Sequence, residues 1–414
     1  MKKQTRRAPA KGTTMSVYER RGVSATKTEV HQAVSKLNPG LYPGAFCRIC
    51  PDVLGDPPSP RYCNIMHPDT DGTKPALAYL VWKVTGNIRA VCGLAQDALV
   101  MNFDDVGCVG ACGRMLATQT LGRNKHIIPG EIIEALIASN REFCERLWPW
   151  GIECTIAAGE TADVGDVIRT LDVASCVTAR MRRKDVIDAS RIVPGDIMIG
   201  FSSTGQAIWE SEPNSGIGCN GLTNARHSVL APHYRKYTET YAPQTPRELV
   251  YCGRYDVDSA LPHDPSQQVW QALLSPTRTY LPLMRAIIKA IPKRYIHGFI
   301  HCTGGGQTKI INFGQPGNVY IIDNPFPIAP VFVLIQRASG LPWEEMYQVS
   351  NMGWRLIMLT PDQGVVEEVR AISAKCRIDS QPVGRVAAPE LSGVTQRRVI
   401  IQSPFGTLVY PKPA

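Results

Sequence analysis

The sequence predicts a mixed α/β (α+β) fold in two domains, and three observations lead to this expectation. The chain has 414 residues, 44% of them hydrophobic, which is enough for two or three cores. Segments with helical spacing alternate with short apolar segments typical of strands. No repeat of short period is visible, which argues against a solenoid.

In the first half, the elements run from a weak helix to a strand. Residues 28–37 have a weakly helical pattern, and a loop rich in Pro and Gly follows. Pro129 opens an amphipathic helix whose apolar residues recur at helical spacing as far as Leu147. Residues 168–178 are rich in small and branched side chains and predict a strand. The turn at residues 193–196, VPGD, then marks a domain boundary.

The second half begins with an apolar strand and continues with a long polar loop, which is typical of a cover over a site. Further strands and helices alternate after it. The predicted elements are a strand at 197–201, a loop at 202–221, a helix at 280–291, strands at 297–301 and 356–360, and a helix from Pro361. We therefore expect a disordered basic tail at residues 1–15, an N-terminal domain at 16–193, a C-terminal domain at 194–400 and a C-terminal extension at 401–414.

Charge and composition narrow the function classes. The net charge of +9 suits anionic partners such as phosphorylated metabolites. Much of the excess lies in the opening MKKQTRRAPAKGTT, and no module of interleaved aromatic and basic residues is present, so we expect no nucleic-acid partner. No apolar run approaches the roughly 18 residues of a membrane span, so we expect no membrane partner.

The 13 cysteines occur without a secretory leader and are typical of reduced thiols in a cytoplasmic enzyme. Cys47, Cys50, Cys63 and His67 imitate a zinc-binding pattern. Such spacings arise easily among so many cysteines, so a structural zinc site is the minor alternative.

The segment HPDTDGTK at residues 67–74 combines carboxylates, a glycine, a hydroxyl and an ammonium within eight residues. A site for a metal ion and a nucleotide phosphate needs these groups together. The segment is not a Walker loop, and a polar turn between two elements is the simpler interpretation of its spacing alone.

Asp97, Asp104 and Asp105 lie in otherwise apolar sequence, where isolated charges are costly unless they pair or bind a cation. Helical spacing places them on roughly one face. An ion-paired helix surface is the alternative, but no basic residue lies between Ala95 and Ala111, which favours a metal site.

Weaker signals follow further along the chain. The small-residue turn at 158–163, AGETAD, permits close approach of a ligand. The segment TGGG at 303–306 can expose successive backbone N–H groups to an anion, although it is more often a flexible turn. Arg278 suits bidentate phosphate binding, with a surface salt bridge as the alternative. His297 and His301 lie on one face of a predicted strand, and each is a candidate functional residue, although a hydrogen-bonded histidine of the core is the alternative for both.

Taken together, these segments resemble the aminoimidazole ribonucleotide synthetase (phosphoribosylformylglycinamidine cyclo-ligase) family over residues 62–386. Their common order and spacing carry the resemblance. The matching segments are DTDGTK, QDALVMNFDD, AGETADVGD, DVIDASRIVPGDIMIGFSSTG, NGL, LLSPTRTY, HGFIHCTGGGQTK and EEMYQVSNMG.

The resemblance implies a homodimer whose N-terminal sheets join in a barrel, an N-terminal ATP-binding and dimerisation domain, and a C-terminal α/β sandwich. It also implies ATP and Mg²⁺ as cofactors and a phosphorylated ribonucleotide as substrate. In the family's reaction, ATP activates the formyl amide oxygen of formylglycinamidine ribonucleotide, and the amidine nitrogen closes the ring to aminoimidazole ribonucleotide. Such chemistry relies on alignment and charge neutralisation.

The resemblance also assigns roles to residues. Asp69, Asp97, Asp105 and Glu160 would hold Mg²⁺, while Thr73, Lys74 and Thr161 would contact the nucleotide. Catalytic roles are implied for Asp69, Lys74 and Asp105, and His301 would handle a proton. Residues implied to bind the ribonucleotide are Asn220, Gly221, Thr277, Arg278, Thr303, Gly304, Gly305 and Gly306.

The sequence departs from the family pattern near the nucleotide site. Thr70 and Asp71 alter the usual DG-x-GTK, Asp104 takes the place of an Asn, Ala158 that of a Gly, and Lys309 that of a Glu. Two alternatives therefore stay open. One is a catalytically silent nucleotide-binding paralogue, and the other is a superfamily relative that acts on another substrate.

Overall fold

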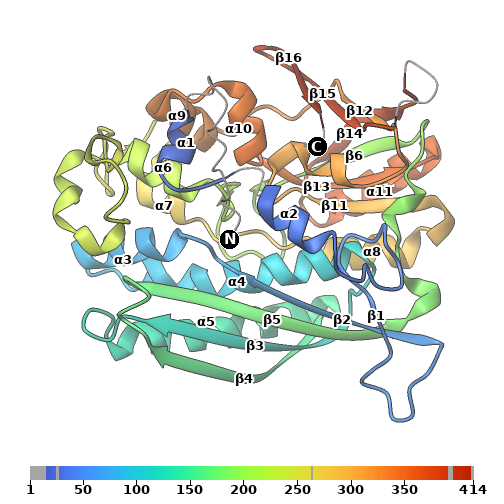
Figure 1. Cartoon of the computed structure of the whole chain (residues 1–414), viewed down its shortest axis with the longest axis horizontal. Coiled ribbons are helices and arrows are strands. Elements are labelled where there is room, and N and C mark those ends of the chain that lie inside the picture. The colour runs from blue at the N-terminus through green and yellow to red at the C-terminus, as the bar shows by residue number, and fades with distance from the viewer. Residues whose placement is uncertain (1–14, 25–27, 263, 390–394, 412–414) are drawn as a thin grey trace, which may run out of the picture.

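The computed structural model describes residues 15–24, 28–262, 264–389 and 395–411 and has the mixed α/β architecture that the sequence predicts. Two main sheets lie at opposite sides of the molecule, with helices between and around them (Figure 1). The predicted basic tail falls almost entirely on residues 1–14, outside the described residues.

The first sheet has five strands in the order β1-β2-β5-β3-β4. All neighbours are antiparallel except β3 and β4, which are parallel and joined by helix α5. Alternate residues of β3 are buried and exposed, so one face of this sheet is covered and the other is open. The strands are β1 (Cys50–Pro51), β2 (Tyr62–Thr70), β3 (Arg114–Arg123), β4 (Glu153–Asp163) and β5 (Leu171–Arg182).

Helix α4 (Arg89–Cys108) lies between the two halves of the chain. It packs on β2 and β5 of the first sheet and also on α8 and β11 of the second half (Figure 1). Almost every residue from Ala90 onward is therefore buried, as expected for a helix that is apolar on all sides. Its three aspartates are buried with the rest, and each needs a partner. Helices α3 (Lys74–Thr85) and α5 (Gly130–Leu147) pack beside α4.

The second sheet has seven strands in the order β11-β13-β6-β14-β12-β15-β16. Only β12 and β15 are parallel neighbours. The three strands at 197–201, 297–301 and 356–360 that the sequence predicts are present and adjacent, because β13 pairs with both β11 and β6. The strands are β6 (Ile197–Ser202), β11 (Gly298–His301), β12 (Val319–Ile322), β13 (Trp354–Thr360), β14 (Ser380–Ala387), β15 (Arg398–Ser403) and β16 (Gly406–Pro411).

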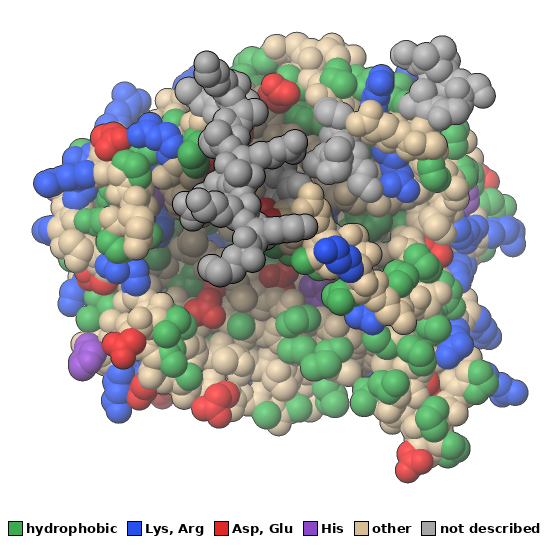
Figure 2. Space-filling model, in the orientation of Figure 1, with side chains coloured by type: hydrophobic (Ala, Val, Ile, Leu, Met, Phe, Trp, Pro, Cys, Tyr) green, Lys and Arg blue, Asp and Glu red, His purple; other side chains and the backbone are tan. Residues whose placement is uncertain are grey.

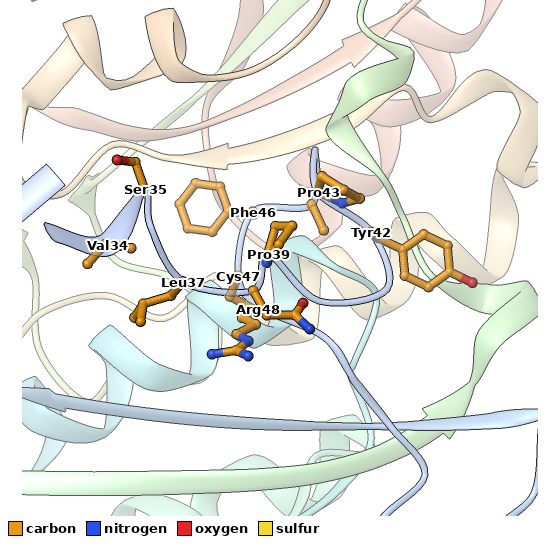
Figure 3. A pocket seen from close by; sticks show the side chains of 11 residues that line it. Val34, Ser35, Leu37, Pro39, Tyr42, Pro43, Phe46, Cys47 and Arg48 are labelled. Atoms are coloured by element: carbon orange, nitrogen blue, oxygen red, sulfur yellow. The ribbon is translucent and has the colours of Figure 1, made fainter. Parts of the chain in front are cut away.

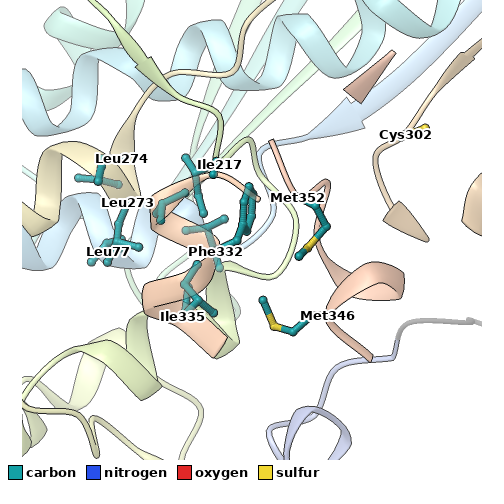
Figure 4. Close-up of a cluster of buried hydrophobic side chains, with 14 of the residues drawn as sticks. Leu77, Ile217, Leu273, Leu274, Cys302, Phe332, Ile335, Met346 and Met352 are labelled. Atoms are coloured by element: carbon teal, nitrogen blue, oxygen red, sulfur yellow. The ribbon is translucent and has the colours of Figure 1, made fainter. Parts of the chain in front are cut away.

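Apolar side chains from both halves of the chain pack together in two buried clusters. Figure 4 shows Leu77 of α3 near Leu273 and Leu274 of α7, with Phe332 and Ile335 of α9 close by. The remaining helices are α1 (Val17–Arg20), α2 (Thr28–Val34), α6 (Leu222–Val229), α7 (Val269–Leu274), α8 (Leu281–Ala290), α9 (Pro330–Ser339), α10 (Trp343–Val349) and α11 (Gln363–Lys375). Two short hairpin ladders join β7 (Thr204–Gly205) to β8 (Asn214–Ser215) and β9 (Ala260–Leu261) to β10 (Asp264–Gln268).

The predicted domain boundary at 193/194 falls in the turn before β6, while the boundary at residue 400 falls within β15. Residues up to 411 belong to the second sheet rather than to an extension, because β16 pairs along its whole length with β15. Among the helices of the described residues, none has the length and apolar character needed to cross a membrane.

Candidate metal and nucleotide site

Three side chains that could hold a metal ion converge where β2 approaches α4. His67 and Asp69 lie two residues apart on β2 and therefore point to the same face of the sheet, toward α4. Asp105 reaches them from the last turn of α4. One ligand atom from each of the three lies within 4.8 Å of the others. We call His67, Asp69 and Asp105 the metal cluster.

A hydrogen-bond network fixes the orientation of His67. The Asn102 amide nitrogen donates to the backbone oxygens of Ala98 at 2.9 Å and Ser175 at 3.1 Å. Its oxygen therefore accepts from His67 Nδ1, at 3.1 Å. With Nδ1 engaged by Asn102, His67 directs Nε2 toward Asp105 Oδ2, 3.4 Å away. An imidazole nitrogen and a carboxylate oxygen that face each other can share a cation, either a proton or a metal ion.

His301 holds Asp105 from the other side. Its Nδ1 lies 2.7 Å from Asp105 Oδ1, and its Nε2 lies 3.6 Å from Asp104 Oδ2. Burial lowers the pKa of His301 to about 4, so the imidazole is neutral at physiological pH and donates its Nδ1 proton to Asp105. His301 is fully buried, and in this arrangement it positions Asp105.

The two carboxylates of the metal cluster differ in their ionisation. Burial raises the pKa of Asp69, and the neighbouring charge of Asp105 adds to this effect. Burial acts in the same direction on Asp105, but Lys309 and His301 outweigh it and hold the pKa of Asp105 below its ordinary value. Asp105 is therefore the carboxylate that keeps its negative charge most firmly, which suits a metal ligand.

A basic and aromatic wall adjoins the metal cluster. Lys309 Nζ donates to Thr303 Oγ1 at 2.7 Å and lies 4.8 Å from the centre of the Phe46 ring. Phe46 also lines a hollow of about 300 Å³ formed by residues 34–48 (Figure 3). Figure 2 shows acidic side chains and a histidine together in a depression near the middle of one face of the molecule.

Asp97 belongs to a separate group that contains its own counter-charge. Lys74 Nζ lies 3.0 Å from Asp97 Oδ1 and also donates to the Ser275 backbone oxygen at 2.7 Å. The Thr277 backbone N–H and hydroxyl donate to the same Asp97 oxygen at 2.7 and 2.5 Å. The side chains of Lys74 and Asp97 are both fully buried. We call Lys74 and Asp97 the buried ion pair, and neither residue belongs to the metal cluster.

The guanidinium suggested for phosphate binding is instead enclosed in protein. Arg278 donates to both carboxylate oxygens of Glu210, at 3.0 and 2.6 Å. Its remaining N–H groups bind the backbone oxygens of Ser202, Thr204 and Gly205. No donor is left for a phosphate in this arrangement, so Arg278 holds the loop that follows β6.

Glu160 and Thr161 lie on the edge strand β4 and are both exposed. Glu160 pairs with Thr120, which pairs with Ala174, which pairs with Thr70. Three strand spacings, about 14 Å, therefore separate Glu160 from Thr70. Glu160 also shares the face of Thr70, opposite to that of Asp69, so a single chain does not bring it to the metal cluster.

The glycine-rich turn and the segment around Asn220 do meet. A Cβ atom on Gly304 would lie 3.6 Å from Asn220 Nδ2. Gly221 precedes α6 with φ of +79°, a conformation that favours glycine. Gly305 and Gly306 also have positive φ, and Cβ on Gly306 would lie 2.4 Å from the Tyr347 backbone oxygen. Thr73 is joined to this region by a hydroxyl contact with Thr223 at 2.8 Å.

The structure also shows the surroundings of Asp71 and of the cysteines in the zinc-like pattern. Asp71 is fully buried with no hydrogen-bond partner on either oxygen, and burial raises its pKa well above the ordinary value. Cys47, Cys50 and Cys63 do not gather with His67, since among the described residues the candidate metal group is formed by His67 with Asp69 and Asp105.

Sequence reasoning missed three contributors to the site. His67 could have been found, because it shares a strand face with Asp69 at a spacing of two residues. Asn102 lies one helical turn before Asp105, where the same argument applies. No local pattern could have placed Lys309 beside these residues, because only the tertiary fold brings it there.

Comparison with known proteins agrees with the resemblance. The family model for the N-terminal domain of AIR synthase related proteins matches residues 62–181. A phosphoribosylformylglycinamidine cyclo-ligase from Thermococcus gammatolerans is 31% identical over 72% of this chain and 72% of its own. The corresponding protein of Thermococcus kodakarensis is 30% identical over 70% of this chain and 71% of its own.

Solved structures share the fold at low sequence identity. The hydrogenase maturation protein HypE in its complex with HypF has a TM-score of 0.52 and 13% identity, covering 94% of this chain and 100% of that one. HypE with ATP has a TM-score of 0.50 and 14% identity, covering 93% and 94%. These similarities concern the fold alone. The sequence identity with the archaeal enzymes decides the assignment, and the chain belongs to the phosphoribosylformylglycinamidine cyclo-ligase (aminoimidazole ribonucleotide synthetase) family.

Proposed function

We propose that this protein is an ATP-dependent cyclo-ligase that converts formylglycinamidine ribonucleotide to aminoimidazole ribonucleotide, ADP and phosphate in purine biosynthesis. The observation that carries the proposal is the identity of about 30% with cyclo-ligases over about 70% of the chain. The metal cluster supports it, since it places carboxylates where the family motif DTDGTK begins.

The reaction needs two phosphorylated molecules aligned and their charges balanced. Transfer of the γ-phosphoryl group to the formyl amide oxygen makes a leaving group. The amidine nitrogen then attacks the formyl carbon, the C–O bond breaks, and phosphate leaves as the nitrogen loses a proton. The chain supplies electrostatics and position for these steps rather than a covalent nucleophile.

Asp69 and Asp105, with His67, fit the binding of a divalent ion, which when bound would neutralise charge on the nucleotide phosphates. Within the site, His301 holds Asp105 in place. The Thr303–Gly306 turn, Asn220 and Gly221 would bind the ribonucleotide, and Lys309 would add positive charge beside them.

We further propose that the enzyme is a cytoplasmic homodimer. Met66 and Leu116 lie on the open face of the first sheet and are 69% and 53% exposed. Side chains of this kind are unusual on an uncovered sheet, and a second copy of the same sheet would bury them. Sedimentation velocity of the wild type and Met66→Glu tests this proposal, with dimer expected for the first and monomer for the second.

The activity is tested by ADP release from purified protein with ATP and divalent metal, with and without formylglycinamidine ribonucleotide. We expect substrate-dependent ADP release matched by aminoimidazole ribonucleotide, lost in Asp69→Asn. Asp323→Asn, which removes a surface carboxylate paired with Arg385, serves as control and should retain activity.

A silent nucleotide-binding paralogue is the second candidate. The full engagement of Lys74 and Arg278 with protein groups favours it, since neither offers its charge to a phosphate in this arrangement. ATP binding without substrate-dependent turnover would support this alternative and contradict the cyclo-ligase.

A further inference from the structure

We propose that the metal cluster selects a first-row transition-metal ion such as Mn²⁺ over Mg²⁺, and that His67 is the residue responsible. The inference deepens the proposed function by naming the ion. It stands on the geometry of the cluster, and metal binding can be measured without turnover.

The composition of the cluster is the first argument. Mg²⁺ prefers oxygen ligands, whereas imidazole nitrogen suits transition metals such as Fe, Ni and Zn. Mn²⁺ shares the preference of Mg²⁺ for carboxylates but, as a transition metal, also accepts an imidazole nitrogen. Asp69 and Asp105 offer oxygen and His67 offers nitrogen. Two ligands of one ion lie at most about 4.4 Å apart, twice a bond of about 2.2 Å. The ligand atoms of the cluster lie within 4.8 Å of one another, so they need to move only slightly closer to bind one ion.

The orientation of His67 is the second argument and is independent of the first. Histidine ligands usually donate their second ring N–H to a protein acceptor, which fixes the tautomer. Asn102 is such an acceptor, and its own amide is fixed by two backbone carbonyls. The free nitrogen, Nε2, consequently points at Asp105, into the cluster.

The charges around the cluster suit a divalent ion. Asp69 and Asp105 supply two carboxylates, and His67 is a neutral ligand in this arrangement. The surrounding groups are His301 and Asp104, which lie beyond Asp105, Lys309, whose positive charge acts on both cluster carboxylates, and Arg355, 3.8 Å from Asp104. The His67 and Asp105 side chains are 23% and 10% exposed, which leaves access for water or a phosphate oxygen.

A titration of metal-free full-length protein tests the selectivity. Free Mn²⁺ is followed by its electron paramagnetic resonance signal, and Mg²⁺ is added as competitor. We expect one tight Mn²⁺ per chain and displacement only by a large excess of Mg²⁺. His67→Gln should weaken Mn²⁺ binding by at least roughly 10–100-fold, the loss that is typical when only a partner behind a metal ligand is removed, and should change Mg²⁺ binding little.

His233→Asn is the matched control, because His233 also pairs with a carboxylate, Asp256, at 3.3 Å, but on an exposed surface. It should bind Mn²⁺ like the wild type. Equal affinities of the wild type for the two ions, or a Mn²⁺ preference that survives in His67→Gln, would overturn the inference.

A measurement on the wild type alone covers the case in which His67→Gln does not fold. Pulsed electron paramagnetic resonance of bound Mn²⁺ should show coupling to an imidazole nitrogen, and its absence would contradict the proposal. Failure of the metal proposal can be distinguished from failure of the proposed function. Nitrogen-ligated Mn²⁺ without ring closure would refute only the cyclo-ligase, whereas ring closure without metal selectivity would refute only the present inference.

Discussion

Asp97 and Asp105 lie on the same helix, α4, but they differ in where a balancing positive charge can come from. Asp97 meets an ammonium, a hydroxyl and a backbone N–H from the protein itself, so its charge is balanced inside the fold. Asp105 accepts a hydrogen bond from His301 and lies in the field of Lys309, but it also faces Asp69 and His67 Nε2, so this end of the helix can accept a cation from outside. Carboxylates eight residues apart on one helix can therefore serve stability at one end and ligand binding at the other.

The largest effect is expected at the buried ion pair. Lys74→Met leaves the Asp97 carboxylate buried without its cation and should lower the free energy of unfolding by about 3–5 kcal/mol. Urea unfolding measures the loss. The double variant Lys74→Met with Asp97→Leu should recover part of it, because the uncompensated charge is then gone. A single variant as stable as the wild type would mean that Asp97 finds another partner.

At the other end of the helix, function should fail before stability. Asp105→Asn keeps an acceptor for His301 and relieves repulsion with Asp69, so the unfolding free energy of the metal-free protein should change by about 1 kcal/mol or less. Stabilisation by added Mn²⁺ in thermal unfolding should disappear in the same variant. If the metal-free variant were as unstable as Lys74→Met, the contrast between the two ends would be wrong.

The titration of Asp104, next to Asp105 on α4, should make the free energy of unfolding depend on pH. Burial raises its pKa to about 7, against about 3.9 for an exposed aspartate. Its contribution to stability is thus complete below about pH 3.9 and is lost as the pH rises to 7. Asp104→Asn, which restores the usual family residue, should gain stability over the wild type across this interval, by up to about 1.4 kcal/mol per pH unit. The expectation would be contradicted if the difference in unfolding free energy between Asp104→Asn and the wild type were the same at pH 5 and pH 7.5.

The smallest effect is expected on the open face of the first sheet. Glu160 lies across the sheet from the metal cluster, so Glu160→Gln should leave the Mn²⁺ affinity of the protein unchanged. The same titration measures it. A clear loss of affinity would show that Glu160 reaches a cluster by another route, such as from a second copy of the chain.

Local sequence was sufficient for several of the elements. The helix that ends at Leu147 follows from periodicity, because a helix buried on one face repeats its apolar residues at a fixed spacing. The strands at 197–201 and 297–301 are short segments that are buried on both faces. The family also followed from sequence, since ordered motifs survive where overall identity is low.

Partners of the charged side chains came only from the tertiary structure. The sequence put Asp97 and Asp105 in one metal site, because helical spacing places both on roughly one face and no basic residue lies between Ala95 and Ala111. The fold divides them, since Thr277 lies 180 positions from Asp97 and His301 lies 196 from Asp105. The sequence by itself determined the family, several of the elements and the apolar surroundings of the α4 aspartates. Which of those carboxylates is neutralised from within, and which is left for an ion, depends on contacts between distant segments that no local pattern encodes.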